Sequence, residues 1–398
     1  MQISFHNDPI RKHISSSGPL CESARHPTQY HQLRQQAANL TDWSNLPTQT
    51  ERHNLTPLLY THLQAANISV PVAIHQQLQA RAIQHSHANR VHGCVLAEIL
   101  TTFQAAGIET LVLKGAALAH LVYPQPGLRP MRDMDLLVSQ SQARLAQALL
   151  AELGFKALPP DDPLPAKHLL AAKRWVEGLQ VTVELHHNLY ANGSPATALE
   201  ALHPAALPLT IAGMTAQTLS YEAMLDHIYQ HLRTNLLLDS PRLIWLADLV
   251  SLAEHFAAEI DWPRVNPHAR NALALCHWLT PLSKELLKTA ALNPGRPPSG
   301  IGQEFQGWPR FSLAAQRPKG HTAILRDSFF PAEGWLRFYY GLPPAPSTKL
   351  RINPSTKLRI GPAFWWSRWV RHPLHILGWV RRYFVDWTKH NNHPKGRG

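Results

Sequence analysis

The chain has 398 residues, of which 44% are hydrophobic and 16% charged, and it contains 33 prolines and 12 tryptophans. This length and apolar content predict a globular protein of two or three domains with a substantial core. Its 3 cysteines lie far apart without metal-ligand spacing, which argues against a disulfide framework or a zinc knuckle and favours a reducing, cytoplasmic compartment. We expect neither a signal peptide nor a spanning helix, because the start lacks a basic and apolar leader and no apolar run approaches roughly 18 residues.

The net charge of +12 is concentrated at the C-terminal end of the sequence. Residues 349–398 contain 11 lysines and arginines but only one acid, Asp386. The rest of the chain is therefore close to neutral. The basic composition describes a tail and not a basic domain.

The N-terminal part predicts two segments. Residues 1–40 are polar and rich in His, Gln and Ser, and we expect a flexible N-terminal segment. Residues 41–107 predict a helical region, because Leu55, Leu59 and Leu63 recur at helical spacing and Gly107 follows the last helical pattern.

The most informative stretch runs from residue 111 to residue 138. The apolar run 111–113 predicts a buried strand, Lys114-Gly115 a turn, residues 116–123 a helix, and the prolines and glycine that follow a loop. A second strand then carries Asp133 and Asp135, whose side chains share one face because strand residues alternate. Two adjacent carboxylates repel each other unless a cation lies between them, and such oxygen ligands suit Mg²⁺ or Mn²⁺. The alternative is a pair of solvated acids on an edge strand.

The next elements continue the same module. Residues 140–153 predict an amphipathic helix ended by Gly154, and residues 155–158 a short strand. After a proline-rich loop, residues 166–176 are expected to be helical. Residues 181–187 alternate as a strand that sets Glu184 and His186 on one face.

The order of strand, glycine turn, helix, loop and acidic strand resembles the nucleotidyltransferase fold shared with DNA polymerase beta. The longer pattern, from Lys114-Gly115 through Arg129 to Asp133-Met-Asp135-Leu-Leu-Val138, resembles a bacterial family of uncharacterised nucleotidyltransferases. The region around Trp43, His53 and Pro57-Leu-Leu-Tyr60 is similar to the helical N-terminal part of that family. The resemblance implies an α+β fold, with a mixed sheet and helices flanked by N-terminal and C-terminal helical regions. It places the catalytic domain at residues 108–215.

The resemblance also implies roles for individual acidic residues. Asp133, Asp135 and Glu184 would hold the divalent ions. The family more often has Asp where this chain has Glu184, so its role is open between metal ligand, base for the attacking hydroxyl, and both. A strand glutamate paired to a neighbouring arginine is the structural alternative. His186 would bind a phosphate or orient Glu184, or it is a structural histidine.

Four further residues are expected at the nucleotide. Lys114 and Arg129 would neutralise phosphates, and Gly115 would let the backbone approach the triphosphate. Ala116 stands where the wider superfamily often has Ser, so backbone contacts must replace a hydroxyl there.

Residues 216–292 predict a helical bundle. His227 and His231 share a helix face, and packing or substrate contact is favoured over metal binding because no acidic partner completes a zinc pattern. For Arg242 and Asp248, structural hydrogen bonding is favoured over substrate contact.

The C-terminal part predicts a proline-rich linker and loop at residues 293–361, followed by a basic, tryptophan-rich tail at residues 362–398. The linker contains a tandem repeat, Pro346-Ser-Thr-Lys-Leu-Arg-Ile-Asn353 and Pro354-Ser-Thr-Lys-Leu-Arg-Ile-Gly361. The tail has three interpretations: binding to an anionic membrane surface, docking on the protein body, or binding of nucleic acid.

The resulting functional hypothesis is a metal-dependent enzyme that uses a nucleoside triphosphate such as ATP. It would transfer the nucleoside monophosphate to an acceptor hydroxyl or phosphate and release pyrophosphate. The acceptor is open among small molecules, sugars, proteins and RNA. The alternative is a catalytically inactive nucleotide-binding or scaffold protein. The expected location is cytoplasmic, with the tail reaching the inner face of the membrane in one interpretation.

Overall fold

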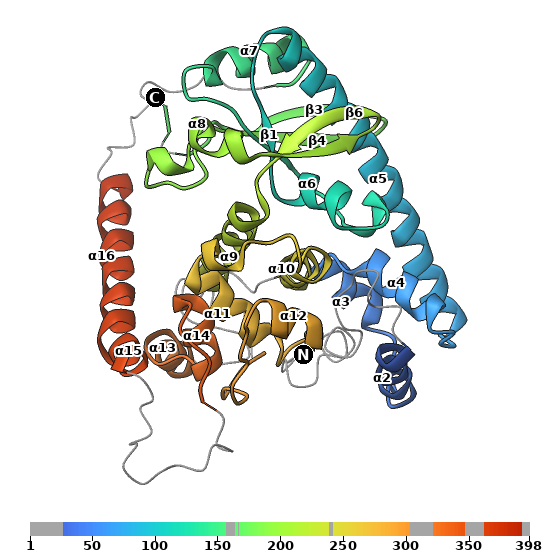
Figure 1. Cartoon of the computed structure of the whole chain (residues 1–398), viewed down its shortest axis with the longest axis vertical. Coiled ribbons are helices and arrows are strands. Elements are labelled where there is room, and N and C mark those ends of the chain that lie inside the picture. Colours follow the sequence, from blue (N-terminus) through green and yellow to red (C-terminus); the bar gives the residue numbers. More distant parts are fainter. Residues whose placement is uncertain are drawn as a thin grey trace.

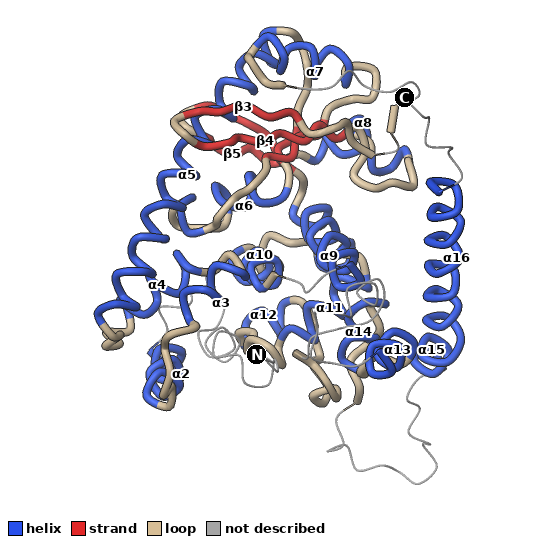
Figure 2. Tube along the Cα trace, turned by 180° about the vertical axis from the view of Figure 1, so that it is seen from behind, coloured by secondary structure: helices blue, strands red, loops and turns tan. Residues whose placement is uncertain are grey.

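The computed structural model describes residues 27–156, 164–165, 167–238, 242–302, 321–346 and 362–391. A mixed sheet with its helices forms one end of the molecule and a helical body forms the other (Figure 1). Seen from behind, the strands are confined to the first end (Figure 2). The predicted α+β class with a mixed sheet is confirmed.

The N-terminal elements are α2 (Pro27–Ala38), α3 (Leu46–Arg52), α4 (Thr56–Ala65) and α5 (Val72–Ala105). Helix α5 is 34 residues long and runs from the helical body to the sheet (Figure 1). It ends just before Gly107, whose φ of +70° is the left-handed conformation that glycine adopts at a helix end.

The sheet has six strands in the order β3-β4-β2-β1-β6-β5. The strands are β1 (Leu111–Val112), β2 (Met134–Leu137), β3 (Ala172–Val176), β4 (Leu179–His186), β5 (Leu207–Ile211) and β6 (Met214–Thr218). Strand β2 is parallel to β4 and antiparallel to β1, while β1 is parallel to β6. Connecting elements are α6 (Lys114–Leu121), η3 (Pro126–Leu128), α7 (Ala143–Glu152), η4 (Pro195–Thr197), α8 (Leu199–Leu202) and η5 (His203–Ala205).

Both faces of the central strands are buried, and each face belongs to a different core. Val112 and Leu136 pack with residues of α5 and α7. Leu111 and Leu137 pack with residues of the helical body. Because strand side chains alternate, Asp135 shares the face of Leu137 and is directed toward the helical body.

Residues 166–176 were predicted to be helical, and that prediction is wrong over β3. Strand β3 forms a hairpin with β4, in which Val176 pairs with Leu179. The two residues between them, Glu177 and Gly178, have φ values of +48° and +76°. Left-handed residues at both turn positions match the twist of a two-residue hairpin, and pairing along a whole strand outweighs local helix propensity.

The strand predicted at residues 155–158 survives only as one bridge, between Lys156 and Lys173, and residues 157–163 lie outside the described residues. The hairpin of β5 and β6 was not predicted. Its turn, Ala212-Gly213, is also left-handed at both positions. The expected domain boundary between residues 215 and 216 falls inside β6.

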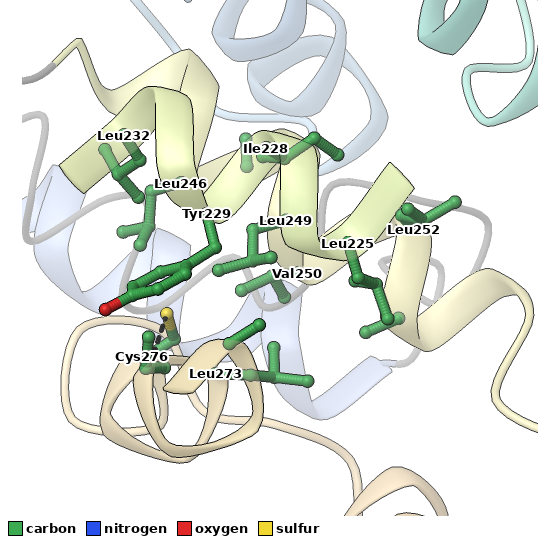
Figure 3. Close-up of a cluster of buried hydrophobic side chains, with 14 of the residues drawn as sticks. Leu225, Ile228, Tyr229, Leu232, Leu246, Leu249, Val250, Leu252, Leu273 and Cys276 are labelled. Carbon is green, nitrogen blue, oxygen red and sulfur yellow. Dashed lines mark hydrogen bonds between the residues drawn. The ribbon is translucent and has the colours of Figure 1, made fainter. Parts of the chain in front are cut away.

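The helical body contains α9 (Tyr221–Leu238), α10 (Leu243–His255), η6 (Trp262–Arg264), α11 (Pro267–Cys276), α12 (Lys284–Thr289), α13 (His321–Phe329) and α14 (Glu333–Tyr340). Figure 3 shows its centre, where Tyr229 of α9 lies between leucines of α10 and the side of α11 that carries Leu273 and Cys276. Each fully buried leucine there contributes about 1.5–3 kcal/mol of transfer free energy.

Helices α13 and α14 fall within the segment expected to be linker and loop. All side chains of α14 are buried, because its aromatic residues fill the space between α9, α11 and the C-terminal helices. The tandem repeat predicted there lies outside the described residues from position 347 to position 361.

The tail forms α15 (Pro362–Trp366), η8 (Ser367–Arg371) and α16 (His372–Asn391). Its first part is docked on the body through His372, whose two ring nitrogens lie 3.0 Å from the Tyr340 hydroxyl and 2.7 Å from the Ser328 carbonyl oxygen. No helix in the described ranges has both the length and the hydrophobicity needed to cross a bilayer.

One buried ion pair joins the loop before β2 to the helical body. Arg129 donates from Nε and Nη2 to the two carboxylate oxygens of Asp248 at 3.2 and 2.6 Å. The Tyr123 hydroxyl donates to the same carboxylate at 2.8 Å. Arg129 and Asp248 are only 7% and 2% exposed. Burying such a pair costs desolvation free energy. Removing only one partner costs more, because the other charge is then buried without a counter-ion.

We therefore expect Arg129→Met to lower the free energy of unfolding by about 3–5 kcal/mol, measured by urea denaturation. Arg90 and Glu177 provide a matched control, because their 2.7 Å pair is half-exposed. Arg90→Met should change stability by at most about 1 kcal/mol. The double variant Arg129→Met/Asp248→Leu should be more stable than Arg129→Met. Equal losses from the buried and exposed pairs would contradict this account.

Burial lowers the pKa of His372 to about 4. The unfolded chain therefore takes up this proton near pH 6.5, while the folded chain stays neutral until about pH 4. The free energy of unfolding must therefore decrease as the pH is lowered through that window. For this histidine alone the decrease is about 2 kcal/mol between pH 7.5 and pH 5. His372→Gln should flatten the slope in chemical denaturation, whereas His87→Gln, at an exposed position, should leave it unchanged. An unaltered slope in His372→Gln would refute the prediction.

Candidate active site

The candidate site is built by the parallel pairing of β2 and β4. In that register Asp135 lies opposite Glu184, and Leu137 lies opposite His186. Paired residues of adjacent strands project from the same face, so acids from two distant segments become neighbours. The predicted meeting of Asp135 with the Glu184-Leu-His186 stretch thus follows directly from the sheet.

Three of these side chains form a compact group. One ligand atom each from Asp135, Glu184 and His186 can be chosen so that all three lie within 4.8 Å of one another. His186 Nε2 lies 2.8 Å from Asp135 Oδ1 and 3.7 Å from Glu184 Oε2. Asp135 and His186 are buried, while Glu184 is partly exposed. Carboxylates with one imidazole are a donor set for divalent ions such as Mn²⁺, and the carboxylates alone suit Mg²⁺.

Asp133 lies beside this group but outside it. It precedes the first residue of β2 and is exposed at the edge of a cleft. Partial burial of its carboxylate and the negative charge of Asp135 raise its pKa. Asp133 therefore belongs to the same electrostatic cluster, although the structure does not bring it into the three-residue ligand group.

Lys114 compensates the most buried acid. Its Nζ lies 2.6 Å from Asp135 Oδ1. Burial opposes the charged forms of both groups, but their mutual attraction outweighs it, so that the pKa of Lys114 is raised and that of Asp135 is held well below its usual range. Lys114 has a φ of +48° at the start of α6, so a left-handed turn aims its side chain at the acids.

Gly115 and Ala116 lie in the first turn of α6. A Cβ atom at Gly115 would lie 2.8 Å from Arg129 Cζ, so the close approach that requires glycine here is to the Arg129 guanidinium. Ala116 is 1% exposed and packs in the core between the sheet and α5. Its side chain does not line the cleft, and the N–H groups of a first helical turn have no partner within the helix.

The cleft next to the acids has a volume of about 200 Å³. The sheet and its loops contribute Lys114, Gly115, Leu118, Arg129, Pro130, Arg132, Asp133 and Asp135. The helical body and the N-terminal helices contribute Asn54, Ile228, His231, Arg242, Trp245 and Asp248. Asp133 and Asp135 thus lie on one wall and Asp248 on the other, with basic groups on both.

Arg132 and Arg242 give the cleft its positive character. Burial lowers the pKa of Arg242, and repulsion by Arg132 adds to that effect. The Arg242 guanidinium carbon lies 5.7 Å from the centre of the Trp245 ring. Two arginines that line one cleft and repel each other favour an anionic ligand there.

The sequence interpretation missed Asn54, Arg132 and Trp245 as cleft residues. Arg132 is adjacent to Asp133 in the sequence, which was a usable signal. Asn54 adopts a φ of +57° between α3 and α4, and nothing in its neighbourhood indicates that this turn faces the acids. His168 was missed because a helix was expected there; its ring lies 5.1 Å from that of His186.

His227 and His231 were assigned to packing or substrate contact. The His231 ring meets Trp245 edge-on at 4.8 Å and lines the cleft, and burial lowers its pKa to about 3. His227 is 2% exposed, and burial holds its pKa well below the usual range. Both histidines are therefore neutral at physiological pH.

Comparison with solved structures finds proteins that resemble part of the chain. The chain is similar to the solved structure of an antigenic nucleotidyltransferase-like protein from Paracoccidioides brasiliensis, with 18% identity over 50% of this chain and 85% of that one and a TM-score of 0.34. It is also similar to ANT(2″)-Ia in complex with adenylyl-2″-tobramycin, with 16% identity over 42% of this chain and 91% of that one and a TM-score of 0.32. No curated protein sequence matches the chain.

The family assignment rests on the sequence itself. The model of one family, described as uncharacterised nucleotidyltransferase, matches residues 39–281. That range covers more than half of the chain and includes both walls of the cleft. The chain therefore belongs to the uncharacterised nucleotidyltransferase family.

Proposed function

We propose that the protein transfers a nucleoside monophosphate from a nucleoside triphosphate to an acceptor, with a divalent cation as cofactor. An acceptor oxygen attacks the α-phosphorus, the bond to the bridging oxygen of the β-phosphate breaks, and pyrophosphate leaves. The acceptor is a hydroxyl or phosphate of a small molecule, sugar, protein or RNA.

The observation that carries this proposal is the register of β2 and β4. It brings Asp135 and Glu184 together with His186, and Asp135 also lines the cleft that contains Arg132 and Arg242. Ligands for a cation and basic groups for a polyphosphate therefore adjoin each other. Phosphoryl and nucleotidyl transfer depend on positioning and charge stabilisation, which this arrangement offers.

The residues present fit a divalent cation. Asp135 and Glu184 offer oxygen atoms and His186 offers Nε2, while Asp133 adds negative charge at the cleft. A bound Mg²⁺ or Mn²⁺ would stabilise the negative charge that develops on the attacking and leaving oxygens. Lys114 compensates Asp135 and also lines the cleft.

The protein's own groups then have distinct roles. Arg132 and Arg242 bind the phosphates electrostatically, and Lys114 adds a third cation. The backbone N–H groups at the start of α6 lie at the same wall. The His186 imidazole near Glu184 lowers the pKa of that carboxyl, so Glu184 is ionised at neutral pH, as a metal ligand must be.

One observation favours a second candidate, a nucleotide-binding protein without transferase activity. Lys114 Nζ lies 2.6 Å from Asp135 Oδ1 and would compete with a cation for that carboxylate. A protein in which this contact persists with nucleotide bound would bind the nucleotide in the cleft but would not catalyse transfer.

We expect Asp135→Asn and Glu184→Gln each to reduce transfer of label from an α-labelled triphosphate into cell-extract acceptors by about a thousandfold, because each removes charge from the ligand group. Calorimetric Mn²⁺ binding should weaken in parallel. Glu177→Gln, in the hairpin turn before the same strand, is the matched control and should retain both. Nucleotide binding without transfer by the unsubstituted protein would favour the second candidate.

We further expect Arg242→Gln to weaken binding of a fluorescent triphosphate by about tenfold or more, because it removes one charge-assisted contact. The exposed Arg264 lies outside the cleft lining, and Arg264→Gln should not alter binding. If Arg242→Gln and Arg264→Gln bind equally well, Arg242 does not contact the phosphates.

A further inference from the structure

The C-terminal helices carry an exposed apolar stripe that lies outside the range matched by the family. Trp365, Trp366 and Trp369 are 46%, 60% and 55% exposed, and Leu374 and Leu377 are 62% and 52% exposed. Phe330, at the end of α13, is 41% exposed and extends the stripe, because its ring lies 5.3 Å from that of Trp369. Monomeric soluble proteins rarely expose large apolar side chains in one contiguous group, and such groups mark interaction sites.

The π-helical turn η8 aligns this stripe. A regular helix advances about 100° per residue, which would place Leu374 opposite Trp365. A π turn inserts about one extra residue and rotates everything after it back by about 100°. With that rotation the three tryptophans, Leu374 and Leu377 fall within one arc of about 100°. Their common exposure agrees with this geometry.

The opposite side of the same helices holds the stripe in place. Phe364, Ser367, His372 and Ile376 are at most 7% exposed. His372 contacts the Tyr340 hydroxyl and the Ser328 carbonyl, and the Arg371 guanidinium carbon lies 4.5 Å from the centre of the Tyr340 ring. The aromatic rings are thus presented outward on a docked helix, so binding need not order them first.

Basic residues flank the stripe. Arg368 lies 5.8 Å from the Trp369 ring centre, and Arg371 and Arg381 are exposed on the same helices. Residues 349–398 contain 11 basic residues against one acid. Tryptophan with leucine and arginine is the combination that enters the interface of a bilayer containing anionic lipid.

We propose that this stripe is a docking surface for an anionic lipid membrane. Its tryptophans could stack on bases, but Leu374 and Leu377 could not, and tryptophan beside leucine suits the interface of a bilayer better than RNA. The arginines that flank the stripe would repel those of an identical stripe on a second copy, which argues against a symmetric dimer. The stripe would hold the protein at a membrane surface through its C-terminal helices, independently of the nucleotide chemistry proposed for the cleft.

The test is flotation of the full-length protein with vesicles of phosphatidylcholine alone or mixed with phosphatidylglycerol. We expect binding to the mixed vesicles that weakens at high salt and is lost on pure phosphatidylcholine. The triple variant Trp365→Ala/Trp366→Ala/Trp369→Ala should lose about tenfold or more of that binding. Trp175→Ala is the matched control, because Trp175 is 70% exposed on β3, away from the stripe.

Thermal denaturation of each variant verifies folding, and the substituted side chains are exposed. Arg368→Gln/Arg381→Gln provides a second variant, which should weaken binding to the mixed vesicles while leaving all three tryptophans in place. Absence of flotation, or equal flotation of the triple variant and Trp175→Ala, overturns the proposal. RNA binding or dimerisation that the triple variant abolishes, without vesicle binding by the unsubstituted protein, overturns it as well.

Discussion

The compensation of buried carboxylates by neighbouring cations is the constraint on which the candidate site depends. Parallel pairing of β2 with β4 forces Asp135 and Glu184 onto one face, where Asp135 is buried and Glu184 is partly exposed. An uncompensated carboxylate in that position would cost several kcal/mol. The Lys114 ammonium removes that penalty for Asp135, and a hydrogen bond between His186 and Asp135 assists it. The apolar opposite face of the strands supplies the core that keeps the register. The acids are therefore close together because the core of the sheet fixes the register of β2 and β4.

The cleft is formed by the sheet and the helical body together. Asp135 and Lys114 come from the sheet and its first helix, whereas Arg242 and Trp245 come from the helical body. The Arg129–Asp248 pair links these two bodies directly beside the cleft. The matched family range, residues 39–281, spans both, so the family unit includes the helices that complete the cleft. The C-terminal helices lie beyond that unit and add a surface of a different chemical character.

Local patterns predicted the elements around the acidic strand well, because each depends on nearby residues. The apolar run at residue 111 and the alternation through Glu184 correspond to observed strands, and the helix expected at residues 116–123 is observed as α6, which already begins at Lys114. Strand β3 was missed because its pairing with β4 outweighs its helical composition. The partner of Arg129 was not identified, because Asp248 lies 119 positions away and is brought close only by tertiary packing. The position of Asp133 outside the ligand group depends on where β2 begins, which alternation cannot locate to one residue.

Gly115 has a structural role that its sequence context does not indicate. Its missing side chain makes room for the Arg129 guanidinium, which in turn holds Asp248 in the helical body. A random-mutagenesis screen for inactive proteins would therefore recover changes at Gly115, Arg129 and Asp248 as one phenotypic class. The result would suggest a glycine-rich nucleotide-binding loop, whereas the shared defect would be the loss of the contact between the sheet and the helical body.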